Sequence, residues 1–309
     1  MSDDKEKVLT VTGLTKIIGK KALVENVSFD VYRGEVFGFL GPNGAGKTTT
    51  IRMLVGLIKP TKGRIAIGSY DIKSQFCHAM RQVGSIVENP ELYTYLTGWE
   101  NLKQFARMLG NITDERIAEI TRMVHLDKRI HDRVKTYSLG MKQRLGIAQA
   151  LLGKPKLLIL DEPTNGLDPA GIRELREFVH ELVRKENMSV FISSHLLSEV
   201  QMLCDRVAII NHGKMITVST IEELVTTATD RVEWKVSPLE RAKAVLETSE
   251  AIKELHEQDG TLVCRMPLEQ ISIYTKALIE EGVQVHGVRE VVVTLEDLFM
   301  ELTRGEESA

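Results

Sequence analysis

A glycine-rich segment between residues 36 and 49 constrains the fold of this chain more than any other stretch. Residues 36–40 form a short apolar run with strand character, and apolar residues return at helical spacing from Lys47 onward. Between them lies a match to the pattern G-x-x-x-x-G-K-[ST], which binds phosphate groups where it joins a strand to a helix. The segment predicts an α/β fold with a phosphate-binding loop; the alternative is a chance match in a glycine-rich turn.

The residue types of this loop suit a triphosphate and a magnesium ion. Glycines let the backbone curl so that several N–H groups point inward at once. Lys47 can reach the β and γ phosphates, the helix that follows presents its positive end to them, and the Thr48 hydroxyl can ligate Mg²⁺. The predicted nucleotide-binding residues are Gly41, Pro42, Asn43, Gly44, Ala45, Gly46, Lys47, Thr48 and Thr49.

The length of 309 residues fits one large and one small domain, or two domains. A net charge of -3 argues against a dedicated nucleic-acid binder, which needs surplus Lys and Arg to neutralise phosphates. No apolar run is long enough to span a bilayer, and the polar residues 1–7 do not resemble a signal peptide, so we expect a cytosolic protein. The three scattered cysteines predict reduced thiols.

Regular elements are predicted around the loop. Three alternating segments predict a small antiparallel sheet, at residues 8–11, 22–31 and 64–68. Thr97 and Glu100 have capping-box spacing before a helix at 101–109, and Thr113 opens a second helix. These features predict a helical segment inserted between the strands of the nucleotide-binding part.

Two further buried strands end in chemically active residues. Strand 157–160 is followed by Asp161 and Glu162, and strand 189–194 is followed by His195. Adjacent carboxylates do not serve stability inside a core. The carboxyl ends of parallel strands are where open α/β sheets bind ligands, so we expect these residues beside the phosphate-binding loop.

The order of these motifs resembles that of the ATP-binding cassette ATPases, over residues 8 to about 220. The motifs that carry the resemblance are 41–48, 138–141, 157–162, 165–168 and His195. It implies a P-loop NTPase fold, with a RecA-like core, an antiparallel β subdomain and an inserted helical subdomain. It also implies that ATP and Mg²⁺ are bound where two cassettes meet head to tail.

The resemblance implies a role for each strand-end residue. Asp161 is similar to the aspartate that holds Mg²⁺, Glu162 to the catalytic glutamate that polarises the attacking water, and His195 to the catalytic histidine that contacts the γ phosphate. Phosphoryl transfer needs such positioning and charge neutralisation more than covalent help. The alternatives are a solvated strand end for the two carboxylates and an ordinary structural histidine.

Ser138 and Gly140 resemble the signature segment that binds the γ phosphate of the ATP held by the opposite subunit. Leu139 and Met141 depart from the family's usual glycine and glutamine. The alternative is a helix N-cap at Ser138 without a nucleotide role.

Two more positions depart from the family pattern. Glu88 stands where a glutamine usually links the metal and water to the membrane subunit, and this carboxylate resembles the bacitracin-resistance and lantibiotic-immunity exporters. It is a predicted metal-site residue; the alternative is neutral variation in an exposed loop. Ile18 stands where an aromatic residue usually stacks on adenine, which predicts weaker discrimination for adenine.

The C-terminal part has its own pattern. Its strands and helices follow the order βαββαβ, which is ferredoxin-like, and residues 295–299 resemble the closing helix of exporter C-terminal domains. The predicted domains are a cassette at 1–222, a small α+β accessory or dimerisation domain at 226–303, and a disordered tail at 304–309.

The leading hypothesis is the ATPase subunit of a two-component exporter of peptide antibiotics or drugs. It implies a separate transmembrane permease, a homodimer or a heterodimer with a related cassette, no nucleic-acid partner, and a peripheral position on the inner face of the membrane. Cassette ATPases of ribosomes or DNA carry a second cassette or a long coiled coil, and neither pattern is present. The remaining alternative is a switch or interaction module that uses ATP without transport.

Overall fold

The computed structural model describes residues 5–229, 231–249 and 251–291. The chain divides into two compact units, Met1–Thr220 and Ile221–Ala309. The predicted helix at 295–299 and the predicted disordered tail at 304–309 lie outside the described residues.

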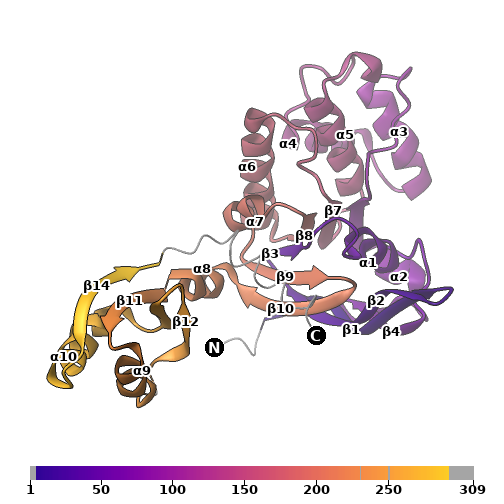
Figure 1. Cartoon of the computed structure of the whole chain (residues 1–309). Helices are drawn as coiled ribbons and strands as arrows, with labels where there is room; N and C mark the ends of the chain where they lie inside the picture. Colours follow the sequence, from indigo (N-terminus) through magenta and orange to yellow (C-terminus); the bar gives the residue numbers. More distant parts are fainter. Residues whose placement is uncertain (1–4, 230, 250, 292–309) are drawn as a thin grey trace. The chain divides into compact units, whose positions relative to one another are not determined.

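The first unit is built around a sheet with the strand order β10-β9-β3-β8-β7-β6 (Figure 1). Neighbouring strands are parallel except β9 and β10. β3, β7 and β8 are buried along their whole length, as expected for parallel strands covered on both faces. Their carboxyl ends meet at one edge, so the predicted site residues that follow them are brought together. The strands are β3 (Val36–Leu40), β6 (Val83–Ile86), β7 (Leu157–Asp161), β8 (Ser189–Ser194), β9 (Arg206–Asn211) and β10 (Lys214–Thr220).

A second, antiparallel sheet has the order β2-β1-β4-β5. It confirms the three predicted strands, but the predicted end of the first strand at Val11 is wrong. β1 continues through Gly13, whose φ of 58° accompanies a shift of register between Val11 and Leu14. The strands are β1 (Lys7–Ile18), β2 (Lys21–Tyr32), β4 (Lys62–Ile67) and β5 (Tyr70–Asp71).

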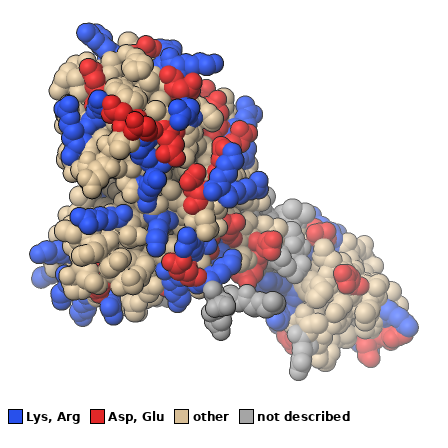
Figure 2. All heavy atoms as spheres, turned by 180° about the vertical axis from the view of Figure 1, so that it is seen from behind, with Lys and Arg blue, Asp and Glu red and all other residues tan. Residues whose placement is uncertain are grey.

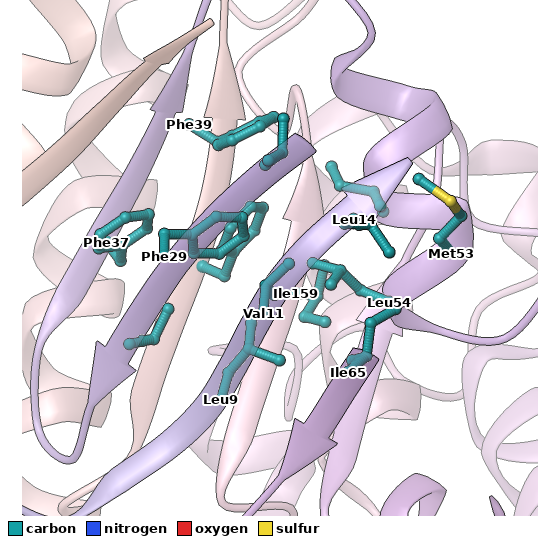
Figure 3. Close-up of a cluster of buried hydrophobic side chains, with 14 of the residues drawn as sticks. Leu9, Val11, Leu14, Phe29, Phe37, Phe39, Met53, Leu54, Ile65 and Ile159 are labelled. Carbon is teal, nitrogen blue, oxygen red and sulfur yellow. The ribbon is translucent and has the colours of Figure 1, made fainter. Parts of the chain in front are cut away.

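An aromatic cluster joins the two sheets (Figure 3). The ring of Phe29 on β2 lies 5.4 Å from that of Phe37 and 5.5 Å from that of Phe39, both on β3, and 5.9 Å from that of Phe191 on β8. Each aromatic pair adds about 0.5–1.5 kcal/mol beyond its buried area. The cluster therefore fixes β3, whose end starts the phosphate-binding loop.

Helices surround this framework, and α3, α4 and α5 form the predicted helical insertion between β6 and β7. The capping box of Thr97 and Glu100 opens α3, and the Thr113 hydroxyl caps α4, so both predicted helix starts are confirmed. The helices are α1 (Lys47–Leu54), α2 (Phe76–Met80), α3 (Gly98–Leu109), α4 (Asp114–Met123), α5 (Leu139–Leu151), α6 (Pro169–Glu186) and α7 (Leu197–Leu203), with a 3-10 turn at Val134–Thr136.

The second unit follows the ferredoxin-like order βαββαβ, with an antiparallel sheet in the order β12-β13-β11-β14. Its core is centred on Trp234, which is completely buried. Asp259 and Gly260 form the turn of the predicted hairpin. The elements are α8 (Ile221–Thr229), β11 (Arg231–Ser237), α9 (Leu239–Glu247), β12 (Lys253–Gln258), β13 (Thr261–Arg265), a 3-10 turn at Leu268–Gln270, α10 (Ile271–Glu280) and β14 (Gln284–Glu290).

Candidate functional site

The loop between β3 and α1 follows the path that the glycine pattern predicts. A Cβ atom on Gly41 would lie 2.3 Å from the carbonyl oxygen of Ile210, so only glycine fits at the start of the loop. Gly44 and Gly46 have φ angles of 81° and 105°, which side chains with a Cβ disfavour. Pro42 and Asn43 lie between these glycines, and Ala45 is buried.

Lys47 opens α1 with Thr48 and Thr49 in the same first turn. Its side chain is 4% exposed, and its ammonium group donates hydrogen bonds to the carbonyl oxygens of Gly41 at 2.8 Å and Pro42 at 3.2 Å. A buried ammonium needs negative partners. Part of that charge comes from Glu162, whose Oε1 lies 3.1 Å from the lysine nitrogen.

Asp161 is the last residue of β7, and its two carboxylate oxygens differ in their hydrogen bonding. Its Oδ1 accepts a hydrogen bond from the Ser193 hydroxyl at 2.6 Å, while its buried Oδ2 lacks a hydrogen-bond partner of normal geometry among the described residues. Burial raises the pKa of this carboxyl, against the lowering effect of Ser193 and of the nearby Thr48 hydroxyl. A buried, unsatisfied carboxylate oxygen facing a threonine hydroxyl is the oxygen donor set that Mg²⁺ prefers.

Glu162 is held in a left-handed backbone conformation, with a φ of 47°. Its Oε2 accepts a hydrogen bond from the Asn165 side chain at 2.6 Å and lies 3.2 Å from Nδ1 of His195. Burial raises the pKa of Glu162, but hydrogen bonds from Asn165 and Lys47 outweigh this effect and lower it below the ordinary value. The carboxylate is thus ionised and can accept a proton at neutral pH.

The structure therefore brings together Lys47, Asp161, Glu162 and His195 at the carboxyl ends of β3, β7 and β8, as the strand-end prediction requires. His195 is half-buried, with 32% of its side chain exposed. A loop that binds phosphate, an ionised carboxylate and an unsatisfied aspartate oxygen form a site suited to hydrolysis of a nucleoside triphosphate.

Ser138 and Gly140 occupy a different part of the unit. The Ser138 hydroxyl caps α5 by accepting a hydrogen bond from the Met141 N–H at 3.3 Å. Among the interactions of the described residues, none joins Ser138 or Gly140 to Lys47. They line an open cavity of about 450 Å³ with Gly166, Leu167 and Asp168.

Comparison with known proteins decides the family. The sequence profile of the ABC transporter family matches residues 24–165. The bacitracin transport ATP-binding protein BcrA of Bacillus licheniformis is 42% identical over 300 residues, which cover 96% of this chain and 98% of that protein. The chain belongs to the ABC transporter ATP-binding proteins.

Two other similarities agree with this membership. An uncharacterized ABC transporter ATP-binding protein, YhcH of Bacillus subtilis, is 45% identical over 296 residues, covering 96% of both chains. The solved structure of an ATP-binding subunit of an ABC transporter is 32% identical with a TM-score of 0.63, covering 70% of this chain and 91% of that one. The predicted P-loop NTPase fold and ATPase class are confirmed for this ABC protein.

Glu88 lies in the loop after β6, with a φ of 65°. Its carboxylate pairs with the guanidinium of Arg52 on α1, and both side chains are exposed. None of the ion pairs of the described residues connects it to Asp161 or Lys47. The metal role of Glu88 in this ABC protein thus stays a prediction, and so does the role of Ile18, which is 58% exposed at the end of β1.

The sequence patterns assigned no role at the site to three residues that contact it, although Asn165 lies within one of the motifs that carry the family resemblance. Asn165 holds Glu162, and Ser193 both donates to Asp161 and accepts the Glu162 N–H at 2.9 Å. Glu199 on α7 accepts hydrogen bonds from two hydroxyls beside the site. The pair of serines at the end of a buried strand could have indicated a role for Ser193. Glu199 lies in an amphipathic helix, and no local pattern distinguishes it.

The surface charge of this ABC protein is mixed on the face that Figure 2 shows, where Lys and Arg are interspersed with Asp and Glu. None of the helices that the structure describes combines the length and the apolar character needed to cross a membrane. The absence of a nucleic-acid partner stays a prediction.

Proposed function

We propose that this chain is the ATP-hydrolysing subunit of an exporter, and that binding and hydrolysis of MgATP at a dimer interface drive a separate transmembrane permease. The observation that carries this proposal is the convergence of Lys47, Asn165 and His195 on the carboxylate of Glu162, directly after β7. Lys47 of a phosphate-binding loop binds the β and γ phosphates of a nucleotide, so this carboxylate lies next to the group that would hold the phosphates.

From these contacts we infer the order in which Lys47, Glu162 and His195 act when ATP binds. A phosphate oxygen that binds Lys47 replaces the contact of the lysine with Glu162, since both are anions competing for one ammonium. The released carboxylate can then take a proton from the attacking water as that water bonds to the γ phosphorus and ADP leaves. His195, 3.2 Å from the carboxylate, then remains to donate to the γ phosphate.

Asp161 and Thr48 fit a magnesium ion. The Oδ2 of Asp161, which has no hydrogen-bond partner of normal geometry in the described segments, and the Thr48 hydroxyl would hold the ion, which would supply charge neutralisation at the phosphate oxygens. Glu88, at the exposed loop after β6, is proposed to act in coupling to the permease, from a position beside α1.

Completion of the site requires a second chain. Ser138 and Gly140 carry a helix N-terminus that can bind phosphate, but they are not joined to Lys47 within the described part of one chain. We propose that they complete the ATP site of the opposite subunit, in a homodimer or in a heterodimer with a related cassette.

The test is complementation between two inactive variants. Lys47→Ala and Ser138→Arg homodimers should each be nearly inactive, because each lesion damages both sites. In a heterodimer of the two, both lesions fall on one interface site, and the other site keeps a normal Lys47 and a normal Ser138. Co-expression with two tags, purification on both and measurement of ATPase activity should recover a fraction of wild-type turnover.

Recovery to about half of the wild-type rate supports the shared site. Activity no higher than that of the single variants contradicts it. A control heterodimer of two differently tagged Lys47→Ala chains should stay inactive, since both of its phosphate-binding loops are damaged.

The similarity to a bacitracin transport protein indicates peptide antibiotics as the proposed substrate class. Export would place the chain on the inner face of the membrane through its permease. Purification from native membranes should bring down a multi-span membrane protein, and overproduction of the pair should raise bacitracin resistance. If the chain is instead a switch without transport, ATPase activity will be present but neither a membrane partner nor resistance will accompany it.

A further inference from the structure

Glu199 on α7 accepts two hydrogen bonds on a single oxygen, from residues that neighbour the proposed catalytic residues in the chain. The Thr164 hydroxyl donates to its Oε2 at 2.6 Å, and the Ser194 hydroxyl donates to the same atom at 2.9 Å. Thr164 and Ser194 are both buried, at 8% and 3% exposure. Two buried hydroxyls therefore share one carboxylate oxygen.

The two donors belong to different segments of the site. Thr164 lies between Glu162 and Asn165 in the turn after β7, and Ser194 immediately precedes His195 at the end of β8. The Glu199 carboxylate thus joins the segment that carries the proposed base to the segment that carries the histidine.

Ser194 also connects this junction to the phosphate-binding loop. Its carbonyl oxygen accepts a hydrogen bond from the Gly41 N–H at 3.3 Å, and its hydroxyl accepts the Leu196 N–H at 3.0 Å. The turn that carries His195 is therefore fixed on both sides, by Gly41 before it and by Leu196 and Glu199 after it.

We propose that Glu199 is a positioning residue for ATP hydrolysis, which sets the distance between Glu162 and His195 through the Thr164 and Ser194 hydroxyls. This inference rests on the proposed roles of Glu162 and His195. In the described part of the chain, the Glu199 carboxylate forms no hydrogen bond or ion pair with Glu162, His195 or Lys47, and it bonds the Ser194 hydroxyl and not the Ser194 carbonyl that Gly41 uses. Its removal should therefore change the geometry of turnover more than the phosphate-binding loop.

The first experiment compares Glu199→Ala with wild type and with Glu177→Ala, which removes an exposed glutamate from α6. Displacement of catalytic groups by a fraction of an ångström should lower kcat about 10- to 100-fold. The affinity for ATP, measured by equilibrium titration, should stay within about 2-fold, because Lys47 and the loop are unchanged. Glu177→Ala should keep wild-type kcat and affinity.

A matched pair at Thr164 separates positioning from packing. Thr164→Val keeps the shape of the side chain but removes the hydroxyl, whereas Thr164→Ser keeps the hydroxyl. We expect Thr164→Val to lower kcat about 10-fold and Thr164→Ser to retain most of it. If Glu199→Ala fails to fold, this pair decides the question alone: equal kcat values for the two variants overturn the proposal.

The double variant Glu199→Ala/Thr164→Val tests whether the two groups act together. If the hydroxyl acts through Glu199, the double variant should lose little more than Glu199→Ala alone. Multiplied losses, or a Glu199→Ala kcat within about 2-fold of wild type, overturn the proposal.

A Glu162→Gln variant assayed in parallel distinguishes failure of the proposed role of Glu162 from failure of the proposed role of Glu199. If it retains turnover, the proposed role of Glu162 has failed. If it is inactive while Glu199→Ala is fully active, only the positioning role of Glu199 has failed.

Discussion

Two buried carboxylates lie at opposite ends of the central sheet. At its amino end Glu35 is 5% exposed and has partners on both oxygens, whereas at its carboxyl end Asp161 is 3% exposed and its Oδ2 lacks a hydrogen-bond partner of normal geometry within the part of the chain that the structure describes. Glu35 accepts the Tyr32 N–H at 2.8 Å and pairs with Arg206 at 3.0 Å. The Arg206 guanidinium also stacks on Tyr32, 4.9 Å from the ring centre. The same type of group is thus saturated by its own chain at one end of the strands and left incomplete at the other.

This contrast indicates how a buried carboxylate can be assigned to structure or to function. A buried charge is tolerated for stability when hydrogen bonds and an opposite charge satisfy it. An incomplete set of partners costs stability, so such a group persists where a ligand completes it. Asp161 falls in the second class, and Glu35 falls in the first.

The largest expected effect is on ATP turnover, from a substitution at the carboxyl end of the central sheet. Glu162→Gln should lower ATP turnover about 10³-fold, because a general base typically contributes 10²–10⁴-fold. ATP binding should persist, since Lys47, Thr48 and Asp161 are unchanged. Steady-state ATPase assays with nucleotide titration check this, and activity above about a tenth of wild type would remove Glu162 from its assigned role. Glu35→Gln, at the other end, should keep wild-type turnover per folded molecule.

The next effect is on stability, from removal of the ion pair at the amino end of the sheet. Arg206→Met should lower the free energy of unfolding by about 3 kcal/mol, because it leaves Glu35 buried without its cation. The double variant Arg206→Met/Glu35→Gln should recover part of this loss. Urea unfolding of the three proteins measures both, and full stability in Arg206→Met would show that the ion pair does not hold this end together.

The stability loss should also depend on pH. Burial raises the pKa of Glu35 above its ordinary value of 4.5, against the lowering effects of Tyr32 and Arg206. The unfolded chain therefore releases this proton at lower pH than the folded chain, and the free energy of unfolding falls as pH rises from about 4.5 through the folded pKa. Without Arg206 the folded pKa rises further, so the loss in Arg206→Met should be larger at pH 8 than at pH 5.

A smaller effect sharpens the comparison at Asp161. Its raised pKa means that the ionised carboxylate destabilises the nucleotide-free protein at neutral pH. Asp161→Asn should therefore stabilise the nucleotide-free form by about 1 kcal/mol, which raises Tm by about 2–4 °C, while it removes Mg²⁺-dependent hydrolysis. Calorimetry at pH 7 with parallel ATPase assays checks both parts, and a lower Tm would contradict the unsatisfied state of the carboxylate.

The smallest expected effect concerns an exposed pair. Arg52→Ala and Glu88→Ala should each change the free energy of unfolding by less than about 1 kcal/mol, as is usual for exposed ion pairs. If Glu88 serves coupling, Glu88→Ala should lower resistance or transport more than basal ATP hydrolysis. Equal losses in both measurements would favour a purely catalytic or structural role.

The sequence predicted most of the site because its residues follow buried strands. Gly41, Asp161 and His195 each come at the end of an apolar run, and the ends of parallel strands meet. The helix starts at Thr97 and Thr113 were predictable because capping is local. In the same way, the order of strands and helices along the second unit followed from alternation and one Asp-Gly turn.

What the sequence did not predict depends on contacts between distant segments. Glu199 meets Thr164, which lies 35 positions earlier, only after α7 packs beside β8. The pairing of Glu88 with Arg52 spans 36 positions, and no local pattern indicates it. The extension of β1 beyond Val11 was missed because a bulge at Gly13 interrupts the alternation without ending the strand.

The left-handed backbone of Glu162 has a consequence for stability. At a φ of 47°, a residue with a Cβ costs about 1–2 kcal/mol relative to glycine. Replacing Glu162 with glycine would relieve this backbone cost, but it would also remove the carboxylate that pairs with the buried ammonium of Lys47. The contacts of the carboxylate with Lys47 and Asn165 therefore offset the strain of the left-handed backbone, and the strained turn after β7 is kept by its side chain.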